Sequence, residues 1–421
     1  MNMIPMEALS SAPPDILSGG IESLASSTEH LSSILSMSTD EAEALGGPLF
    51  GFSLFPYLAF LYFLSREETN CPKGVTVGFA TLLLFVFLTI PAAICAKLQF
   101  GVSLADSDWL HGSAESLLTI TNLVTVVAFR QALNAKEQQA ETMPASAESY
   151  GPMIALAIPL ILLAGVTAFV PGLSGAEVHA PYLNGFMDLP YNFFADNLGA
   201  NPEPANALTV ATWIIHISSL VEFLVAMGFA WRWADVSNNP TWKGLTWGLL
   251  PLHSSGITAC TYHLFYNGIP VMVPLQAFLT CLGNVTAAYA AFRIARYEGW
   301  KPEEELDGAL AWANAFLSDD AETSSTSSRN DNTQIREESA SLVGFEDLGN
   351  ALKGDTDFSF VVKLFVGCAV ASYGVKYGAT FFDFPYDANV YLGLAVILVP
   401  SALNAFKWYK RGLDPTFEGW F

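Results

Sequence analysis

Long apolar segments limit the fold of this chain more than any other feature of its sequence. A helix that crosses a membrane needs about 20 consecutive, mostly apolar residues. Of the 421 residues, 52% are apolar and 14% are charged, whereas a soluble domain carries about 25% charged residues. The sequence therefore predicts an all-α fold, a polytopic transmembrane helix bundle. Nine spans are expected, at 46–65, 75–96, 110–129, 153–173, 207–230, 245–267, 270–290, 359–379 and 387–406.

The distribution of Lys and Arg gives an independent test of the number of spans. Basic residues collect in the loops on one side of a membrane. With nine spans, twelve basic residues that border the spans fall on the side of the C-terminus, and two, Lys97 and Lys376, fall on the side of the N-terminus. Dropping or adding one span would destroy this alternation. We therefore expect the N-terminus on the trans side and the C-terminus on the cis side.

The negative charge of the chain is concentrated in two polar segments. The formal net charge is −22, and residues 1–45 contain seven acidic residues and no Lys or Arg. Residues 302–357 are rich in Ser, Thr, Asp and Glu, which is typical of a solvated, disordered linker. Because such a chain offers no basic patch, no nucleic-acid partner is expected. Membrane lipid is the partner that the spans predict.

The third and seventh expected spans share a pattern of polar residues. The pattern is Glu115, Thr119, Asn122 and Arg130 in the third span and Gln276, Thr280, Asn284 and Arg293 in the seventh. Internal repeats are common in transporter-like folds. One interpretation is therefore a duplication that produces two parallel three-helix units. The alternative is a chance similarity between two apolar helices.

The spans and polar segments together predict the domain organisation. An acidic tail and an acidic linker flank the membrane units, and a further helix connects the two units. The predicted parts are the tail (1–45), the first three-helix membrane unit (46–132), the connector helix (153–173), the second three-helix membrane unit (206–297), the linker (302–357) and a C-terminal helix pair (359–421).

Ionisable side chains inside the expected spans are the candidate functional residues. Such groups are costly at membrane depth, so a chain that keeps them usually pairs them or uses them. His111 and Glu115 are four residues apart, which places them on one helix face. We assign His216, His253 and His263 to cofactor binding, and His111, Glu115 and Glu222 to a polar site or proton relay. Hydrogen bonding between helices is the alternative role for all of them.

The expected cofactor is a tetrapyrrole, either haem or chlorophyll. A neutral imidazole in an apolar helix bundle is a common axial ligand. His253 and His263 are ten residues apart, so about 15 Å of helix separates them and they cannot ligate one metal ion. No metal-ion site is expected. The chain has no GxxxxGK[ST], HExxH or GxSxG motif, so an enzymatic activity is not favoured.

Two blocks of the chain resemble known families. Residues 49–132 contain SLADSDWLHGSAES, and residues 206–297 contain TWIIHISSLVEF and LLPLHSSGITACTYHLF. The first block resembles an uncharacterised membrane-protein family of cyanobacteria and photosynthetic plastids, and the second resembles a conserved hypothetical plastid open-reading-frame family. The resemblance implies an integral plastid membrane protein of the thylakoid. In that membrane the N-terminus is expected in the lumen and the C-terminus in the stroma.

The resemblance and the membrane histidines lead to two functional hypotheses. The first is a non-enzymatic thylakoid factor that supports the assembly or stability of a photosynthetic complex, with subunits of that complex as partners and a tetrapyrrole bound by the histidines. The second is a proton-coupled small-molecule or ion transporter, or a quinone-handling membrane protein. In the second hypothesis the His and Glu side chains move protons.

Overall fold

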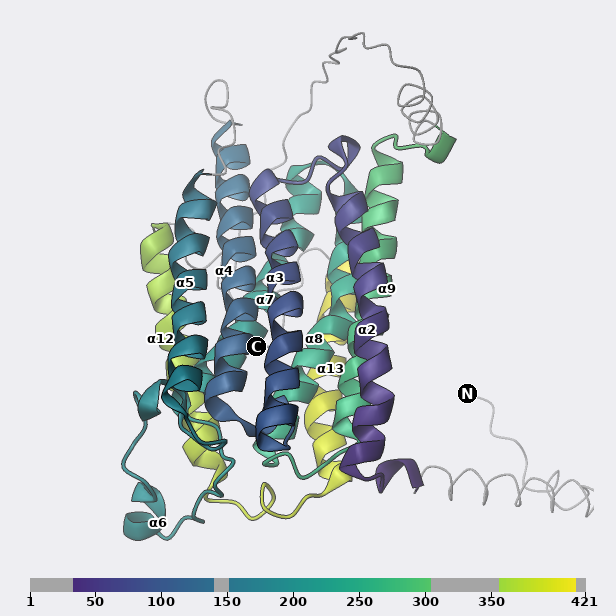
Figure 1. Ribbon diagram of the computed structural model, residues 1–421. Coiled ribbons are helices and arrows are strands. Elements are labelled where there is room, and N and C mark those ends of the chain that lie inside the picture. Colours follow the sequence, from purple (N-terminus) through teal and green to yellow (C-terminus); the bar gives the residue numbers. More distant parts are fainter. Residues whose placement is uncertain (1–32, 140–150, 304–355, 414–421) are drawn as a thin grey trace, which may run out of the picture.

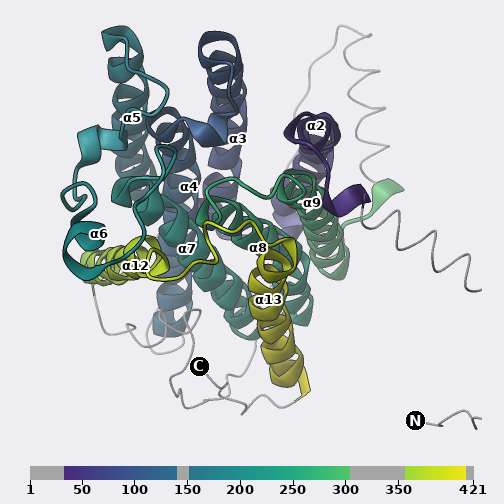
Figure 2. The same cartoon turned by 90° about the horizontal axis from the view of Figure 1, so that it is seen from below.

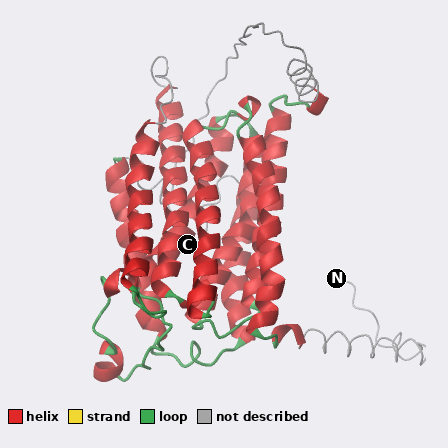
Figure 3. Ribbon diagram, in the orientation of Figure 1, coloured by secondary structure: helices red, strands yellow, loops and turns green. Residues whose placement is uncertain are grey.

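The computed structural model describes residues 33–139, 151–303 and 356–413 (Figure 1). Within these residues the chain forms helices and connecting loops, and no strand occurs (Figure 3). This architecture confirms the predicted all-α bundle. The long helices are α2 (Thr39–Leu64), α3 (Lys73–Cys95), α4 (Asp108–Gln139), α5 (Gly151–Ser174), α7 (Val210–Val236), α8 (Lys243–Leu264), α9 (Met272–Tyr297), α12 (Asp357–Ala379) and α13 (Val390–Leu413).

A helix occurs at each of the nine expected spans, and seven of these helices are long and apolar enough to cross a membrane. The two others are α5 and α8. Helix α5 has 24 residues and an apolar sequence, and the part of it whose side chains the structure describes begins at Ile158. Helix α8 carries buried polar residues such as Ser254, Thr258 and Thr261. Because neighbouring helices enclose α8, its polar side chains face protein instead of lipid, and its mean hydropathy can be lower than that of an exposed span.

Short helices and loops cover the end of the bundle at which α2, α4 and α7 begin, which is the lower end in Figure 1. We call it the lower end throughout. Its short elements are η3 (Ala96–Phe100), η4 (Leu104–Asp106), η5 (Tyr182–Gly185) and α6 (Phe193–Leu198). At the opposite end lie η2 (Glu67–Thr69) and η6 (Pro240–Trp242). The tail 1–45 and the linker 302–357 lie mostly outside the described residues.

The helices of the two expected three-helix units pack across each other. Helix α2 lies along α9 and has few contacts with α3, while α4 lies along α7 (Figure 2). Helix α3 packs on α4, and correspondingly α8 packs on α9. The first helix of each expected unit therefore pairs with the last helix of the other. Helix α12 packs on α7, and α13 packs on α8.

Equivalent hydrogen bonds join the two crossing pairs of helices. The Asn122 side-chain amide on α4 donates to the Ser219 carbonyl on α7 at 3.1 Å. The Asn284 side-chain amide on α9 donates to the Ser53 carbonyl on α2 at 3.0 Å. The two asparagines belong to the repeated pattern of polar residues. They therefore have the same structural role in both expected units.

The starts of α3 and α8 also correspond. Helix α3 begins Lys-Gly-Val-Thr-Val-Gly and α8 begins Lys-Gly-Leu-Thr-Trp-Gly. The last glycine of each motif, Gly78 or Gly248, lies against the neighbouring helix. A Cβ atom would clash with Thr125 Oγ1 at the first position and would lie 2.7 Å from the Thr286 carbonyl oxygen at the second. Both positions thus need glycine for close helix packing.

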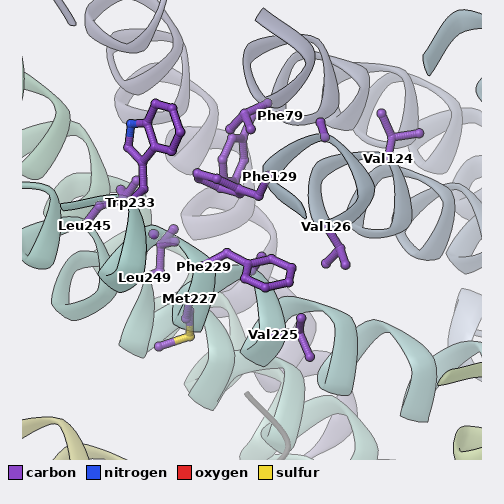
Figure 4. Close-up of a cluster of buried hydrophobic side chains, with 14 of the residues drawn as sticks. Phe79, Val124, Val126, Phe129, Val225, Met227, Phe229, Trp233, Leu245 and Leu249 are labelled. Atoms are coloured by element: carbon purple, nitrogen blue, oxygen red, sulfur yellow. The ribbon is translucent and has the colours of Figure 1, made fainter. Parts of the chain in front are cut away.

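Buried apolar side chains fill the centre of the bundle. Figure 4 shows part of this cluster, with Phe79 from α3, Phe129 from α4, Phe229 from α7 and Leu249 from α8. Large apolar side chains are also exposed on the outer helices, for example Phe55, which is 66% exposed. Exposed apolar surface of this kind is expected where helices contact lipid. The five cysteines are all described, and none forms a disulfide.

Candidate functional site

Three buried histidines from three helices meet at the lower end of the bundle. His111 lies in the first turn of α4, His216 lies in α7, and His263 lies in the last turn of α8. The Nε2 atom of His111 is 3.1 Å from the Nε2 atoms of both His216 and His263. Each side chain is at most 7% exposed. We call these three residues the histidine triad.

A close approach of α4 to α7 places His111 against His216. Gly112 permits this approach, because a Cβ atom at that position would lie 2.7 Å from Thr212 Oγ1 and 2.9 Å from the Tyr182 ring. Thr212 in turn donates a hydrogen bond of 2.6 Å to Asp108 Oδ1, at the start of α4. Glycine at 112 and this hydrogen bond therefore hold the two helices at the distance that the triad requires.

A side-chain amide orients the third imidazole. The Nδ1 atom of His263 lies 3.0 Å from Asn267 Oδ1. The Asn267 amide nitrogen donates to Asp106 Oδ1 at 2.7 Å and to the Ala105 carbonyl at 3.2 Å, which identifies its oxygen as the atom facing His263. Since that oxygen only accepts, Nδ1 of His263 carries the proton. The Nε2 atom of His263 then presents a lone pair to the triad.

Hydrogen bonding within the triad cannot satisfy all three Nε2 atoms. Each Nε2 has either one proton or one lone pair in the ring plane. The Nε2 atom of His111 faces two nitrogen atoms at 3.1 Å, so it can make only one full hydrogen bond. A metal ion, in contrast, accepts a lone pair from all three nitrogens. Metal–nitrogen bonds of about 2.0–2.1 Å place neighbouring ligand atoms roughly 3–3.4 Å apart. The distances from His111 to the two other nitrogens fit that arrangement, and the ligand atoms of all three histidines lie within 4.8 Å of one another.

The triad leaves no room for a macrocycle between its three rings. The centroids of the imidazole rings lie 4.8–5.1 Å apart, so a porphyrin plane cannot enter between them. A recess with a cavity volume of about 10 Å³ adjoins His263 and is lined also by Glu203, Trp213, Tyr266 and Lys376. Cofactor pockets commonly measure about 300–1,000 Å³. The donor set and the space at the triad therefore suit an ion, and the expected haem or chlorophyll stays a prediction.

The structure groups the candidate residues differently from the sequence analysis. His111, which we assigned to a relay, joins His216 and His263. His253 lies earlier in α8 than His263 does, and its ring stacks on Phe223 with the ring centroids 6.4 Å apart. Its Nδ1 atom has no hydrogen-bond partner. The triad was missed because its members lie in different spans. One signal could have found it, since the expected topology places all three at the same membrane side.

The two candidate acids of the proton relay lie outside the triad. Glu115 is half-buried, one turn of α4 away from His111. Glu222 is 4% exposed, and its Oε2 atom has no hydrogen-bond partner. The triad instead has two other acids near it, Asp106 and Asp108, that the sequence analysis did not consider. Asp106 is the last residue of η4, and Asp108 is the first residue of α4.

An ion pair borders the recess beside His263. It joins α12 to the loop between α5 and α7. The Lys376 ammonium donates to Glu203 Oε1 at 2.9 Å and to the Leu208 carbonyl at 2.7 Å. Burial raises the pKa of the Glu203 carboxyl above its usual value, although Lys376 opposes the shift. Helix α12 therefore closes one side of the approach to the triad.

Two family models match the blocks singled out from the sequence. Residues 46–134 match a family of proteins of unknown function, DUF3593, and residues 207–293 match another, DUF2499. The Ycf49-like protein of Synechocystis sp. is 40% identical over 93 residues, which are 22% of this chain and 89% of that protein. The chain belongs to the Ycf49-like family. The uncharacterized protein ycf49 of Cyanophora paradoxa is 30% identical over 87 residues, 20% of this chain and 85% of that protein.

These comparisons confirm the resemblance to an uncharacterised family of cyanobacteria and plastids. With its apolar helices, this Ycf49-like chain is a multi-pass membrane protein. No solved structure matches it. The triad draws on both matched blocks, because His111 lies in the first and the other two histidines lie in the second. His111 and His216 are 105 positions apart, so a match of 93 residues cannot contain both.

Proposed function

We propose that this Ycf49-like chain is a membrane protein that binds one transition-metal ion through His111, His216 and His263. The observation that carries the proposal is the convergence of three buried Nε2 atoms from three helices. Imidazole is a common ligand of zinc, copper, iron and nickel ions. An ion at this position satisfies the nitrogen lone pairs that hydrogen bonding within the triad leaves unpaired.

The setting of the site supports a role in binding and not only in packing. A polar group buried without a partner is costly, particularly among membrane helices. Three imidazoles that face one another leave a buried nitrogen without a full hydrogen bond unless something binds between them. In the register of the repeated polar pattern, Met272 occupies the place of His111 in the other expected unit. The fold alone therefore does not require histidine there.

We place this function in the thylakoid membrane, where the metal-loaded protein supports the assembly or stability of a photosynthetic complex without catalysing a reaction. The cyanobacterial and plastid relatives support this setting. With the expected topology, the triad lies near the lumenal face. The metal ion replaces the tetrapyrrole as the cofactor proposed for the triad, because the space between the three rings suits an ion.

Metal analysis of the purified full-length protein tests the proposal. We expect about one transition-metal ion per chain, retained through gel filtration in mild detergent. His111→Ala, His216→Ala or His263→Ala should each lower the occupancy at least tenfold, because three ligands are needed for tight binding. His253→Ala is the matched control, since it removes a buried histidine from the same bundle, and it should leave the occupancy unchanged. Equal metal content in all four variants would reject the site.

A further inference from the structure

We propose that the triad takes a divalent ion, whose charge is balanced by two nearby acids, the half-buried Asp106 and the buried Asp108. The inference rests on the proposed function and adds the charge class of the ion. Three neutral imidazoles donate lone pairs but contribute no negative charge. An ion held by them alone would keep its full charge in a region of low dielectric constant, which is unfavourable without nearby counter-charge.

Asp106 is coupled to the triad through Asn267. Its Oδ1 atom accepts a hydrogen bond of 2.7 Å from the Asn267 amide, whose oxygen lies 3.0 Å from His263 Nδ1. Its Oδ2 atom accepts one of 2.8 Å from Ser103 Oγ. A chain from carboxylate to metal-bound histidine raises the donor strength of the imidazole and fixes its orientation. The same chain brings one negative charge close to the proposed ion.

The backbone at Asn267 indicates that this orientation is specifically maintained. Tyr266 and Asn267 both have positive φ angles, 48° and 64°. Asparagine tolerates this region, but a tyrosine adopts it rarely. The turn after α8 therefore adopts an unfavourable conformation where it points the Asn267 amide at His263. Such conformations concentrate at functional sites.

Asp108 supplies the second negative charge. It is 6% exposed and lies one turn before His111 on α4. Its oxygens accept hydrogen bonds from Thr212 Oγ1 at 2.6 Å, from the Thr209 amide at 3.3 Å and from the Tyr182 amide at 2.8 Å. Three donors to one carboxyl group favour its ionised form. These donors offset part of the cost of burying its negative charge.

The two acids near the triad favour an ion of charge +2. Asp106 and Asp108 contribute two negative charges. The nearby Lys376 and Glu203 form an ion pair of 2.9 Å and cancel each other. A divalent ion compensates both of these charges, whereas a monovalent ion such as Cu⁺ would leave one of them uncompensated. Zn²⁺ and other divalent first-row ions that imidazole binds well are therefore the expected class.

The charge class is tested with the full-length protein and the variant Asp106→Asn. Asparagine keeps an oxygen that accepts from Asn267, and its amide can donate to Ser103, so the change mainly removes charge. The protein in mild detergent is stripped with a chelator and titrated separately with Zn²⁺ and, under reducing conditions, with Cu⁺. Asp196→Asn is the matched control, because it makes the same substitution at an exposed position of α6.

We expect the wild-type protein to bind Zn²⁺ more tightly than Cu⁺. Asp106→Asn should lower the Zn²⁺ affinity by about 10–100-fold. Because a charge–charge interaction scales with the charge of the ion, the Cu⁺ affinity should fall only by about the square root of that factor. The control variant should match the wild type with both ions.

The remaining outcomes identify which proposal fails. Tighter binding of Cu⁺ than of Zn²⁺ by the wild-type protein overturns the charge class and leaves the metal site intact. Equal losses for the two ions, or no loss of Zn²⁺ affinity, show that Asp106 does not act as counter-charge and also overturn it. If the wild-type protein binds neither ion, the proposed function itself is wrong.

Discussion

At the scale of single residues, the site depends on a glycine as much as on the histidines. Gly112 follows His111 directly, and it is the point where α4 comes closest to Thr212 of α7 and to the Tyr182 ring. A larger residue would push the two helices apart. His111 would then move away from His216, although no ligand has been changed.

Gly112→Ala should therefore weaken both the bundle and the site. The added methyl group would meet Thr212 Oγ1 at 2.7 Å, and overpacking of this kind costs about 1–3 kcal/mol of unfolding free energy. Thermal unfolding in detergent and Zn²⁺ titration measure the two effects. Gly47→Ala in α2 is the control, because a Cβ atom there has no neighbour within 4 Å. Equal stability and affinity in both variants would contradict the close approach.

At the scale of elements, the loop between α5 and α7 and the end of α12 together form the wall beside the triad. Burial raises the pKa values of Glu203 and of Asp188 in this loop above their usual values. Lys376 of α12 lies within 2.9 Å of Glu203 and opposes the shift of that residue. Both acids therefore bind protons more strongly in the folded protein than in the unfolded chain.

The direction of these shifts predicts how stability depends on pH. Glu203 has a usual pKa of 4.5 and a higher one when folded. Its protonation stabilises the fold fully below pH 4.5, and this contribution is lost as the pH rises through the folded pKa. Glu203→Gln should therefore flatten the fall in unfolding free energy above pH 4.5, by at most about 1.4 kcal/mol per pH unit. Denaturation series at several pH values measure this slope. A steeper slope in the variant would contradict the prediction.

At the scale of the whole molecule, two family blocks are joined in one chain and interlock. Helix α2 of the first block packs on α9 of the second, and α4 packs on α7. The triad lies at one of these contacts and takes ligands from both blocks. The contacts between blocks, and not the connecting chain, should therefore hold the site together.

Cleavage of the chain between the blocks tests this arrangement. A protease site can be inserted between Leu198 and Gly199, at an exposed end of α6, where insertions are best tolerated. After cleavage of the folded protein, we expect the two pieces to elute together and to keep the bound metal ion. The uncleaved protein with the same insertion is the control. Separation of the pieces under native conditions would show that the contacts between blocks are too weak to maintain the site.

The sequence by itself determined the properties that depend on segment length and on the type of residue. Apolar segments of about 20 residues identify the helices, because a span must bury its backbone polar groups in its own hydrogen bonds. The alternation of loops with and without basic residues gives the expected orientation, because it depends only on residue type and on the order of the spans. The repeated asparagines, Asn122 and Asn284, were also visible, since a pattern along one helix needs no knowledge of its neighbours.

Only the tertiary structure decided which helices pack together and which histidines meet. Nothing local in α2 indicates that it packs on α9 instead of α3, because apolar faces of membrane helices are chemically alike. His111 and His263 are 152 positions apart, and their contact depends on the packing of α4, α7 and α8. Spacing along the sequence shows which residues share one face of a helix, such as His111 and Glu115. A metal site, in contrast, needs side chains that converge in space from different helices.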